Sequence, residues 1–186
     1  MISHLLLYLA CHKRLGIIFR KLPNSSPKII ELYTDADYGA DQSRKSTTGF
    51  VLKFHNKVVS WTSRLQSSIA ESSTEAELNA LTEGTREALF LLRLQEDLLS
   101  IQEYPFMAYE DNTATYENCV SLASPNRLKH VESLLFKPQE YVQQGLMRLT
   151  LVGSLQQLAD ILTKPLPQTL FLQLRNQLMY DDSTVH

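Results

Sequence analysis

Four carboxylate residues have types and positions suited to hydrolytic chemistry: Asp35, Glu77, Asp111 and Asp160. Asp35 and Asp111 fall where predicted strands end, and the other two lie on predicted helices. Residues at strand ends of an open sheet converge on one edge, where a helix on that face can add a carboxylate. Carboxylates in one cleft raise each other's pKa, and divalent cations with oxygen ligands relieve the repulsion. Two such cations, roughly 4 Å apart, can activate a water and stabilise the leaving oxygen of a phosphodiester.

Each acid also fits a structural role. Asp35 can form a turn at a strand end, and Asp111 can cap the N-terminus of a helix. Glu77 follows Thr74 at the spacing of a capping box, and Asp160 can be a solvated helix residue. Taken singly, each structural role is the more common one. Spacing alone therefore permits an acidic metal site without establishing that the four acids meet.

The elements that position these acids follow a mixed pattern. Period-two apolar stretches indicate strands, and apolar residues at a period of 3.6 indicate helices. Strands are expected over residues 29–36, 49–54, 58–62, 104–109 and 146–152, and helices from Thr74, after Asp111, and over residues 131–142 and 155–163. The order β-β-β-α-β-α-α-β-α predicts an α/β fold, a mixed sheet of antiparallel and parallel strands covered by helices.

Several side chains carry more specific expectations. The helix from Thr74 should bury one broad face made of Ala76, Leu81, Ala88, Leu91, Leu92 and Leu98. Phe50 and Trp61 lie in apolar strand patterns and should be core residues. Pro138 should break or kink its helix, because proline lacks a backbone N–H.

The N-terminal segment reads as a separate helix. Helical spacing is shared by four apolar residues, Ile2, Leu5, Leu6 and Leu9. Gly16 is a candidate stop. The apolar run over residues 5–10 is too short to span a membrane, and no basic residue precedes it. The prolines and short polar residues of 23–27 predict a domain boundary near residue 25.

Composition limits the function without naming it. The 186 residues, 44% of them hydrophobic, suffice for one sizeable core with appendages. A net charge of -2 gives no global attraction to nucleic acid, so any polyanion-binding surface must be a local patch. Cys11 and Cys119 are far apart and lack zinc-site spacing, which favours a reducing compartment.

A set of short motifs occurs in a recognisable order. The motifs are Tyr33–Asp37 (YTDAD), Arg44–Gly49 (RKSTTG), Ser60–Trp61 (SW), Ser72–Leu78 (SSTEAEL), Glu110–Asn112 (EDN) and Leu158–Leu166 (LADILTKPL). Each is weak alone, but together, between residue 29 and about residue 167, they form a specific match. The chain resembles the ribonuclease H module of a copia-type retrotransposon Pol polyprotein, which implies the ribonuclease H-like fold.

The resemblance also implies an activity and a site. Family members are metal-dependent endonucleases that hydrolyse the RNA strand of RNA–DNA hybrids during reverse transcription. The implied catalytic and metal-binding residues are Asp35, Glu77, Asp111 and Asp160, with two Mg²⁺ or Mn²⁺ ions as cofactors. Glu77 is preferred over Glu75 because the family's acid directly precedes a hydrophobic residue. Asp37 shares the strand face of Asp35 and is a reserve candidate.

A hybrid substrate requires contacts to two backbones and to 2′-hydroxyls. The candidate substrate-binding residues are Arg44, Lys45, Ser46, Arg64, Asn112 and Lys129, with Arg127 and Lys164 as further basic candidates. For each basic residue a solvated surface role is at least as common. His130 is a candidate proton shuttle, although a lone histidine in a helical segment is more often structural or exposed.

The resemblance divides the chain into three parts: residues 1–25 as a remnant of the reverse-transcriptase thumb or connection, residues 26–167 as the ribonuclease H-like domain, and residues 168–186 as a C-terminal helix and tail. The implied partners are the hybrid, reverse transcriptase and other Pol segments, with no membrane. The implied setting is a cytoplasmic retrotransposon particle, or the nucleus.

Two other functions remain open. One is a non-catalytic module that acts as a structural or nucleic-acid-binding remnant. The absence of a Tyr-x-Asp-Asp-like polymerase motif and two departures from the family pattern, at residues 130–138 and 153–157, favour this reading. The other is a nuclease or integrase of the same fold, since such folds host several chemistries. The Leu158–Leu166 motif argues against the latter.

Overall fold

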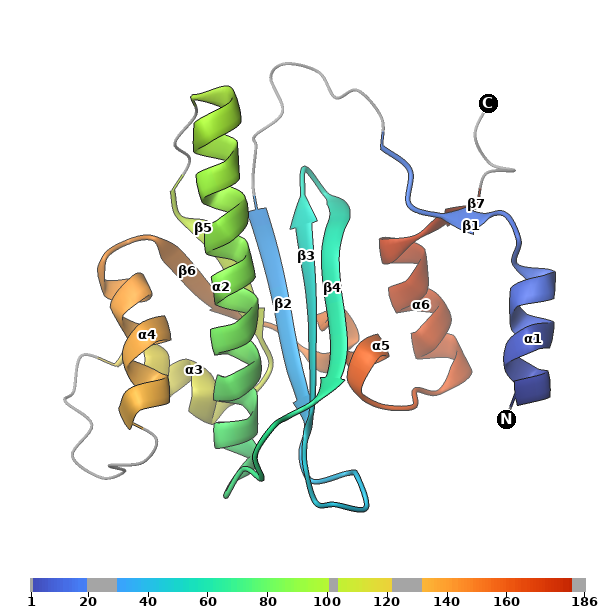
Figure 1. The fold of residues 1–186 in the computed structure, drawn as a ribbon, viewed down its shortest axis with the longest axis horizontal. Coiled ribbons are helices and arrows are strands. Elements are labelled where there is room, and N and C mark those ends of the chain that lie inside the picture. Colours follow the sequence, from blue (N-terminus) through green and yellow to red (C-terminus); the bar gives the residue numbers. More distant parts are fainter. Residues whose placement is uncertain (1, 20–29, 101–103, 122–131, 182–186) are drawn as a thin grey trace.

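The centre of the molecule is a five-stranded sheet in the order β4-β3-β2-β5-β6 (Figure 1). The computed structural model describes residues 2–19, 30–100, 104–121 and 132–181, with backbone alone for residues 132–136 and 181. The strands are β2 (Ile30–Asp37), β3 (Thr47–Phe54), β4 (Lys57–Leu65), β5 (Phe106–Glu110) and β6 (Met147–Leu151). The first three form an antiparallel meander, while β5 pairs in parallel with both β2 and β6. The predicted α/β fold and the order of its central elements are confirmed.

Helices cover both faces of the sheet. One face packs against α2 (Ser73–Leu99), α3 (Thr113–Val120) and α4 (Glu132–Gln143), and the other against α5 (Asp160–Thr163) and α6 (Gln168–Leu178). Successive side chains of β3 point to opposite faces of the sheet. Leu52 therefore packs in the core beneath α2, whereas Val51 packs in the core beside α6. Phe50 is buried in the α2 core, as expected.

The start of α2 differs from the predicted capping box. Ser72 is the N-cap, and its hydroxyl accepts a hydrogen bond from the backbone N–H of Glu75. The Glu75 carboxylate in turn accepts from the N–H of Glu71. The prediction that Thr74 and Glu77 form this cap is wrong, because the helix begins two residues earlier than that pair requires. Glu77 is therefore free to face the sheet.

Gly49 allows α5 to approach the sheet. A Cβ atom built on Gly49 would lie 2.5 Å from Thr163 Cγ2 and 3.2 Å from both the carbonyl oxygen of Ala159 and Leu162 Cβ. Glycine is thus required where β3 and α5 touch. This contact fixes the short helix whose first residue is Asp160.

Two apolar residues expected in the core are exposed. Leu98 is 71% exposed because the end of α2 extends beyond the strands, as Figure 1 shows. Trp61 is 57% exposed because β4 is an edge strand. The Trp61 side chain borders an apolar groove of about 340 Å³ with Ile17, Phe171 and Leu178. The remaining residues of the predicted α2 face, apart from half-buried Leu91, are buried.

Two helix expectations also need correction. The α4 helix continues through Pro138, so the predicted break is wrong; the proline ring is buried there. The helix expected over residues 155–163 divides into the 3₁₀ turn η1 (Ser154–Gln156) and α5. The division leaves Gln157, Leu158 and Ala159 buried between the two turns.

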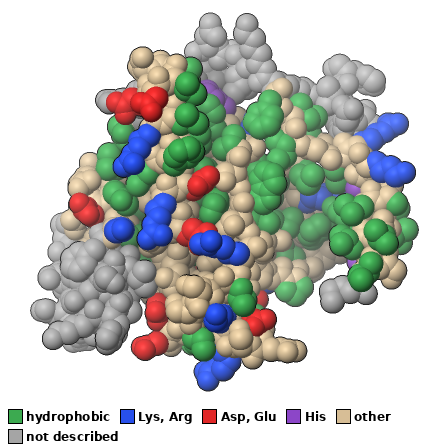
Figure 2. Space-filling view, viewed as in Figure 1, with side chains coloured by type: hydrophobic (Ala, Val, Ile, Leu, Met, Phe, Trp, Pro, Cys, Tyr) green, Lys and Arg blue, Asp and Glu red, His purple; other side chains and the backbone are tan. Residues whose placement is uncertain are grey.

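The N-terminal segment forms the helix α1 (Ile2–Cys11) followed by the short strand β1 (Leu15–Gly16). The helix is confirmed, but it ends before Gly16, which lies in the strand. β1 pairs antiparallel with β7 (Tyr180–Asp181), a pairing that sequence patterns did not predict. The apolar residues of α1 are exposed, and green side chains gather over this helix in Figure 2. The predicted boundary near residue 25 lies outside the described residues. Within the described part of the chain, none of the helices combines the length and apolar character needed to cross a bilayer.

Candidate metal centre

Three of the four predicted acids meet at one edge of the sheet. Asp35 lies near the C-terminal end of β2, and Asp111 directly follows β5. Since β2 and β5 are adjacent and parallel, their C-terminal ends lie together. Glu77, on the buried face of α2, points to the same place. One carboxylate oxygen from each of these three residues lies within 4.8 Å of the others, a spacing that suits a metal ion.

Asp160 lies on the α5 side of this group and is not a member of it. Its Oδ1 atom is 2.9 Å from Lys164 Nζ, and the same ammonium is 3.4 Å from Asp35 Oδ1. The Thr163 hydroxyl also donates a hydrogen bond to Asp35. Lys164 therefore links the fourth predicted acid to the three-acid group.

Burial and mutual repulsion set the charge state of the cluster. Burial, followed by the charges of Glu110 and Asp35, raises the pKa of Glu77 to about 10. Burial and then Asp35 also raise the pKa of Asp111. Burial raises the pKa of Asp160 to about 6. The hydrogen bond from Lys164 lowers this pKa and so limits the increase. In Lys164 the bond to Asp160 and the charge of Asp35 outweigh burial and raise the pKa.

Glu110 is a fifth acidic residue beside the site, and sequence reasoning assigned it no role. It is fully buried, and burial raises its pKa to about 8. Its carboxylate accepts hydrogen bonds from the Thr34 hydroxyl at 3.3 Å and from the backbone N–H of Asn112 at 3.1 Å. The available signal was an acidic residue ending an otherwise apolar strand, directly before Asp111.

The predicted substrate-binding residues are distributed unevenly. Asn112 caps α3, and its Oδ1 accepts from the N–H of Thr115, so the cap is Asn112 rather than Asp111. Ser46 is buried, and its hydroxyl accepts from the N–H of Gly39. Arg44 is exposed and Lys45 half-buried in the adjoining turn. Lys129, together with Arg127 and His130, lies outside the described residues.

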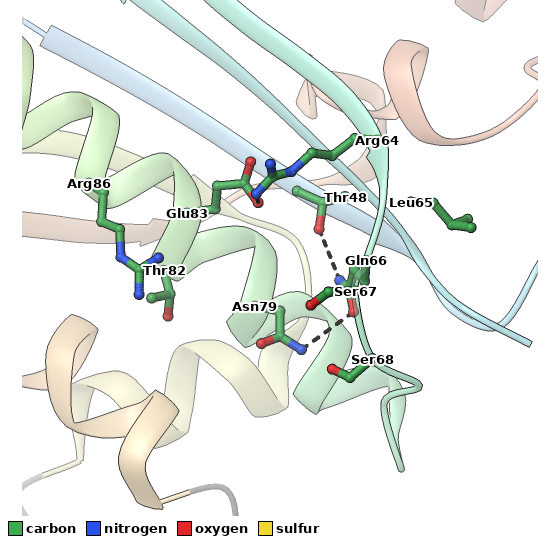
Figure 3. A pocket seen from close by; sticks show the side chains of 10 residues that line it. All are labelled: Thr48, Arg64, Leu65, Gln66, Ser67, Ser68, Asn79, Thr82, Glu83 and Arg86. Carbon is green, nitrogen blue, oxygen red and sulfur yellow. Dashed lines mark hydrogen bonds and ion pairs between the residues drawn. The ribbon is translucent and has the colours of Figure 1, made fainter.

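Arg64 lines a polar pocket of about 290 Å³ between the end of β4 and α2 (Figure 3). Its guanidinium is 2.7 Å from the Glu83 carboxylate, which neutralises part of its charge. Gln66 braces the pocket wall by donating to Thr48 Oγ1 and to the carbonyl of Ala76. Arg86 projects from α2 into the same region. Basic side chains gather over this face of α2 and β4 in Figure 2, with acidic ones among them.

The relatives found by comparison with known proteins include retrovirus-related Pol polyproteins of plant transposons. The chain is 31% identical over 171 residues to the "Retrovirus-related Pol polyprotein from transposon RE1" of Arabidopsis thaliana, covering 91% of this chain and 12% of the relative. It is 31% identical over 147 residues to the corresponding polyprotein from transposon TNT 1-94 of Nicotiana tabacum, covering 78% and 11%. The chain thus spans about an eighth of the length of these relatives. No protein-family model matches the chain.

Solved structures with the same fold include ribonucleases H. The N-terminal RNase H domain of rv2228c from Mycobacterium tuberculosis superposes with a TM-score of 0.56 at 14% identity, covering 81% of this chain and 98% of that one. LC11-RNase H1, solved in complex with an RNA/DNA hybrid, gives 0.54 at 12% identity, covering 72% and 93%. This chain is therefore a ribonuclease H-like domain that is homologous to one segment of the retrovirus-related Pol polyproteins of plant transposons.

Proposed function

We propose that this chain is the ribonuclease H of a copia-type retrotransposon Pol polyprotein and hydrolyses the RNA strand of RNA–DNA hybrids. The observation that carries the proposal is the meeting of Asp35, Glu77 and Asp111 at the C-terminal edge of the sheet, with Asp160 beside them. The family resemblance and the ribonuclease H fold add independent support.

The donor set fits divalent cations of the Mg²⁺ or Mn²⁺ type. All its ligands are carboxylate oxygens, which hard cations prefer. Glu77 Oε2 is buried and has no hydrogen-bond partner among the described residues, as expected of an atom reserved for a ligand. Asp35, Glu77 and Asp111 would hold one cation, and Asp35 and Asp160 would hold a second. Two such ions activate a water and stabilise the leaving oxygen of a phosphodiester.

The surrounding residues keep these ligands in place. Thr34 and the N–H of Asn112 hold Glu110, which places the β5 end next to β2. Thr163 orients Asp35 by donating a hydrogen bond to it. Such outer partners fix the direction in which ligand oxygens point, and their loss typically lowers metal affinity or activity by roughly 10–100-fold.

For the substrate we propose a local basic surface rather than a global field. Arg44 and Lys45 lie in the turn before β3, and Arg64 and Arg86 line the pocket of Figure 3. These cations would contact the phosphates of the hybrid, while Ser46 and Asn112 shape the adjacent backbone. Because phosphate contacts release counterions, each contact removed should lower the salt dependence of binding by about one unit of slope.

The exposed apolar face of α1 supports a proposal about the protein partner. Its side chains, Ile2, Leu5, Leu6 and Leu9, are all more than half exposed. A contiguous apolar face of this kind marks an interaction surface. We propose that it packs against other Pol segments, reverse transcriptase among them, in a cytoplasmic particle or in the nucleus.

Cleavage of a labelled hybrid tests the proposed function. The full chain should cut the RNA strand with Mg²⁺ or Mn²⁺ and should not cut it with EDTA. Asp111→Asn should remove the activity, whereas the matched control Asp97→Asn, at an exposed position near the far end of α2, should retain it. A folded parent protein that binds the hybrid in both ions without cutting it would instead establish the non-catalytic alternative.

A further inference from the structure

The acidic cluster has two sides that differ in their cations. The lysine side comprises Asp35, Asp160 and Lys164, and the open side comprises Glu77, Glu110 and Asp111. On the lysine side one ammonium lies 2.9 Å from Asp160 Oδ1 and 3.4 Å from Asp35 Oδ1. Among the described residues, no ion pair reaches the three acids of the open side. Asp35 therefore borders a region that already contains a cation and one that does not.

Lys164 enters the lysine side from the surface. Its side chain is 36% exposed, whereas those of Asp35 and Asp160 are 2% exposed. It stands at the C-cap of α5, where its backbone N–H bonds to the carbonyl of Asp160. The backbone is thus fixed at this point, while the four-carbon side chain retains a route to solvent.

A second divalent cation held by Asp35 and Asp160 would occupy the region of this ammonium. Two like charges a few ångströms apart repel strongly in a partly buried site, so both cannot stay there. We propose that Lys164 is an internal competitor for the second cation: the first ion binds at Asp35, Glu77 and Asp111, and the second binds only as Lys164 moves out. The inference rests on the proposed function, because it presupposes that the acids bind divalent cations.

The occupancy of the two positions is measurable without any cleavage. Mn²⁺ titration of the full chain, followed by calorimetry and by the paramagnetic resonance of free Mn²⁺, should resolve one tight and one weak ion in the parent. Lys164→Met should tighten the second ion by at least about tenfold, because the competing charge is gone. Lys164→Arg keeps the charge and should keep the weak second ion. Lys13→Met, at an exposed position after α1, is the matched control and should titrate like the parent.

A second measurement uses the chain without any substitution. This avoids Lys164→Met, which leaves the buried carboxylates of Asp35 and Asp160 without their cation and can destabilise the fold. Reductive methylation of lysines, located by mass spectrometry, should label Lys164 faster at saturating Mg²⁺ than in EDTA, since metal binding moves the ammonium towards solvent. Lys13 should be labelled at the same rate in both conditions.

The outcomes separate this inference from the function on which it rests. The inference would be overturned if the second Mn²⁺ ion had the same dissociation constant in the parent and in Lys164→Met. It would also be overturned if Mg²⁺ did not change the labelling rate of Lys164. If Asp111→Asn nevertheless lost the tight ion, the metal-dependent function would stand. A parent chain that binds no Mn²⁺ at all would overturn both.

Discussion

The lysine side and the open side show how neighbours decide the charge of the same chemical group. Asp160 is buried, yet the ammonium beside it limits the rise of its pKa to about 6. Burial also raises the pKa of Glu77, and with acids as its nearest charged neighbours that pKa reaches about 10. Burial is the largest cause of both shifts, and neighbouring charges adjust it: the ammonium lowers the pKa of Asp160, whereas acids raise that of Glu77 further. The open side is therefore the part of the cluster that a bound cation would stabilise most.

Asp35 belongs to both sides in function, so replacing it should have the largest effect. Asp35→Asn removes a ligand common to both proposed cations and should reduce hybrid cleavage by more than about 100-fold, beyond the loss typical of an outer-sphere partner. The measurement is the initial rate of RNA cleavage at saturating Mg²⁺. Asp37→Asn, two residues along the same strand, is the matched control. Loss of activity in Asp37→Asn but not in Asp35→Asn would show that the strand supplies a different ligand.

The contact between Gly49 and α5 offers a way to disturb the lysine side alone. In Gly49→Ala the new methyl group meets Thr163 and Ala159, so we expect a loss of about 1–3 kcal/mol in unfolding free energy. Gly153→Ala is the control, because a Cβ there meets nothing within 4 Å and its φ is -80°. Denaturant melts of both variants give the comparison. If Gly49→Ala were as stable as its control, α5 could shift away from β3 without a loss of unfolding free energy.

Replacing Glu77 by a neutral side chain tests the open side, because the folded protein keeps this carboxyl protonated where the unfolded chain ionises it. Glu77→Gln should raise the unfolding free energy of the metal-free protein at pH 8 by at least about 1 kcal/mol, the equivalent of one pKa unit. It should also abolish the stabilisation that Mg²⁺ gives to the parent. Thermal melts in EDTA and in Mg²⁺ measure both effects, with Glu117→Gln on the exposed side of α3 as control. Destabilisation of the metal-free protein would contradict the assignment of Glu77 to a repulsive cluster.

The most gradual effect is a decline in the unfolding free energy of the metal-free protein with rising pH. The folded-state pKa of Glu77 lies above its ordinary 4.5, so the folded protein holds a proton that the unfolded chain releases. Its contribution is fully present below pH 4.5 and is lost as pH rises to about 10. The metal-free parent should therefore lose stability between these limits, and Glu77→Gln should show a shallower decline. Denaturant melts in EDTA at a series of pH values provide the measurement. If the unfolding free energy declined equally with pH in the parent and in Glu77→Gln, the titration of Glu77 would not cause the decline.

Much of this fold and part of the site could be predicted from sequence because the relevant patterns are local. Strand ends place Asp35 and Asp111, and a helix following the meander places Glu77. The function of Ser72 as the cap was missed because two neighbouring residues, Ser72 and Thr74, each precede a glutamate by three positions. Both the burial of Glu110 and the reach of Lys164 depend on the packing of distant elements. Neither feature produces a periodic residue pattern from which it could be predicted.

The pairing of β1 with β7 was equally invisible, because strands of two residues carry no measurable alternation. Trp61 shows a related limit: its apolar neighbours identify a strand, but only the sheet order shows that the strand lies at an edge. Sequence therefore predicted elements well and their borders and edges less well.

The β1–β7 pair also has a consequence for the order of folding. It joins Leu15 to Asp181, so forming it closes a loop of almost the entire chain. Loop-closure entropy makes such a contact slow to form, and only two residue pairs reward it. We expect the pair to form after the central sheet and to open first in native-state hydrogen exchange, well below the free energy of global unfolding. Each opening would release Ile17 from its contact with the core beside α6 and widen the apolar groove beside Trp61.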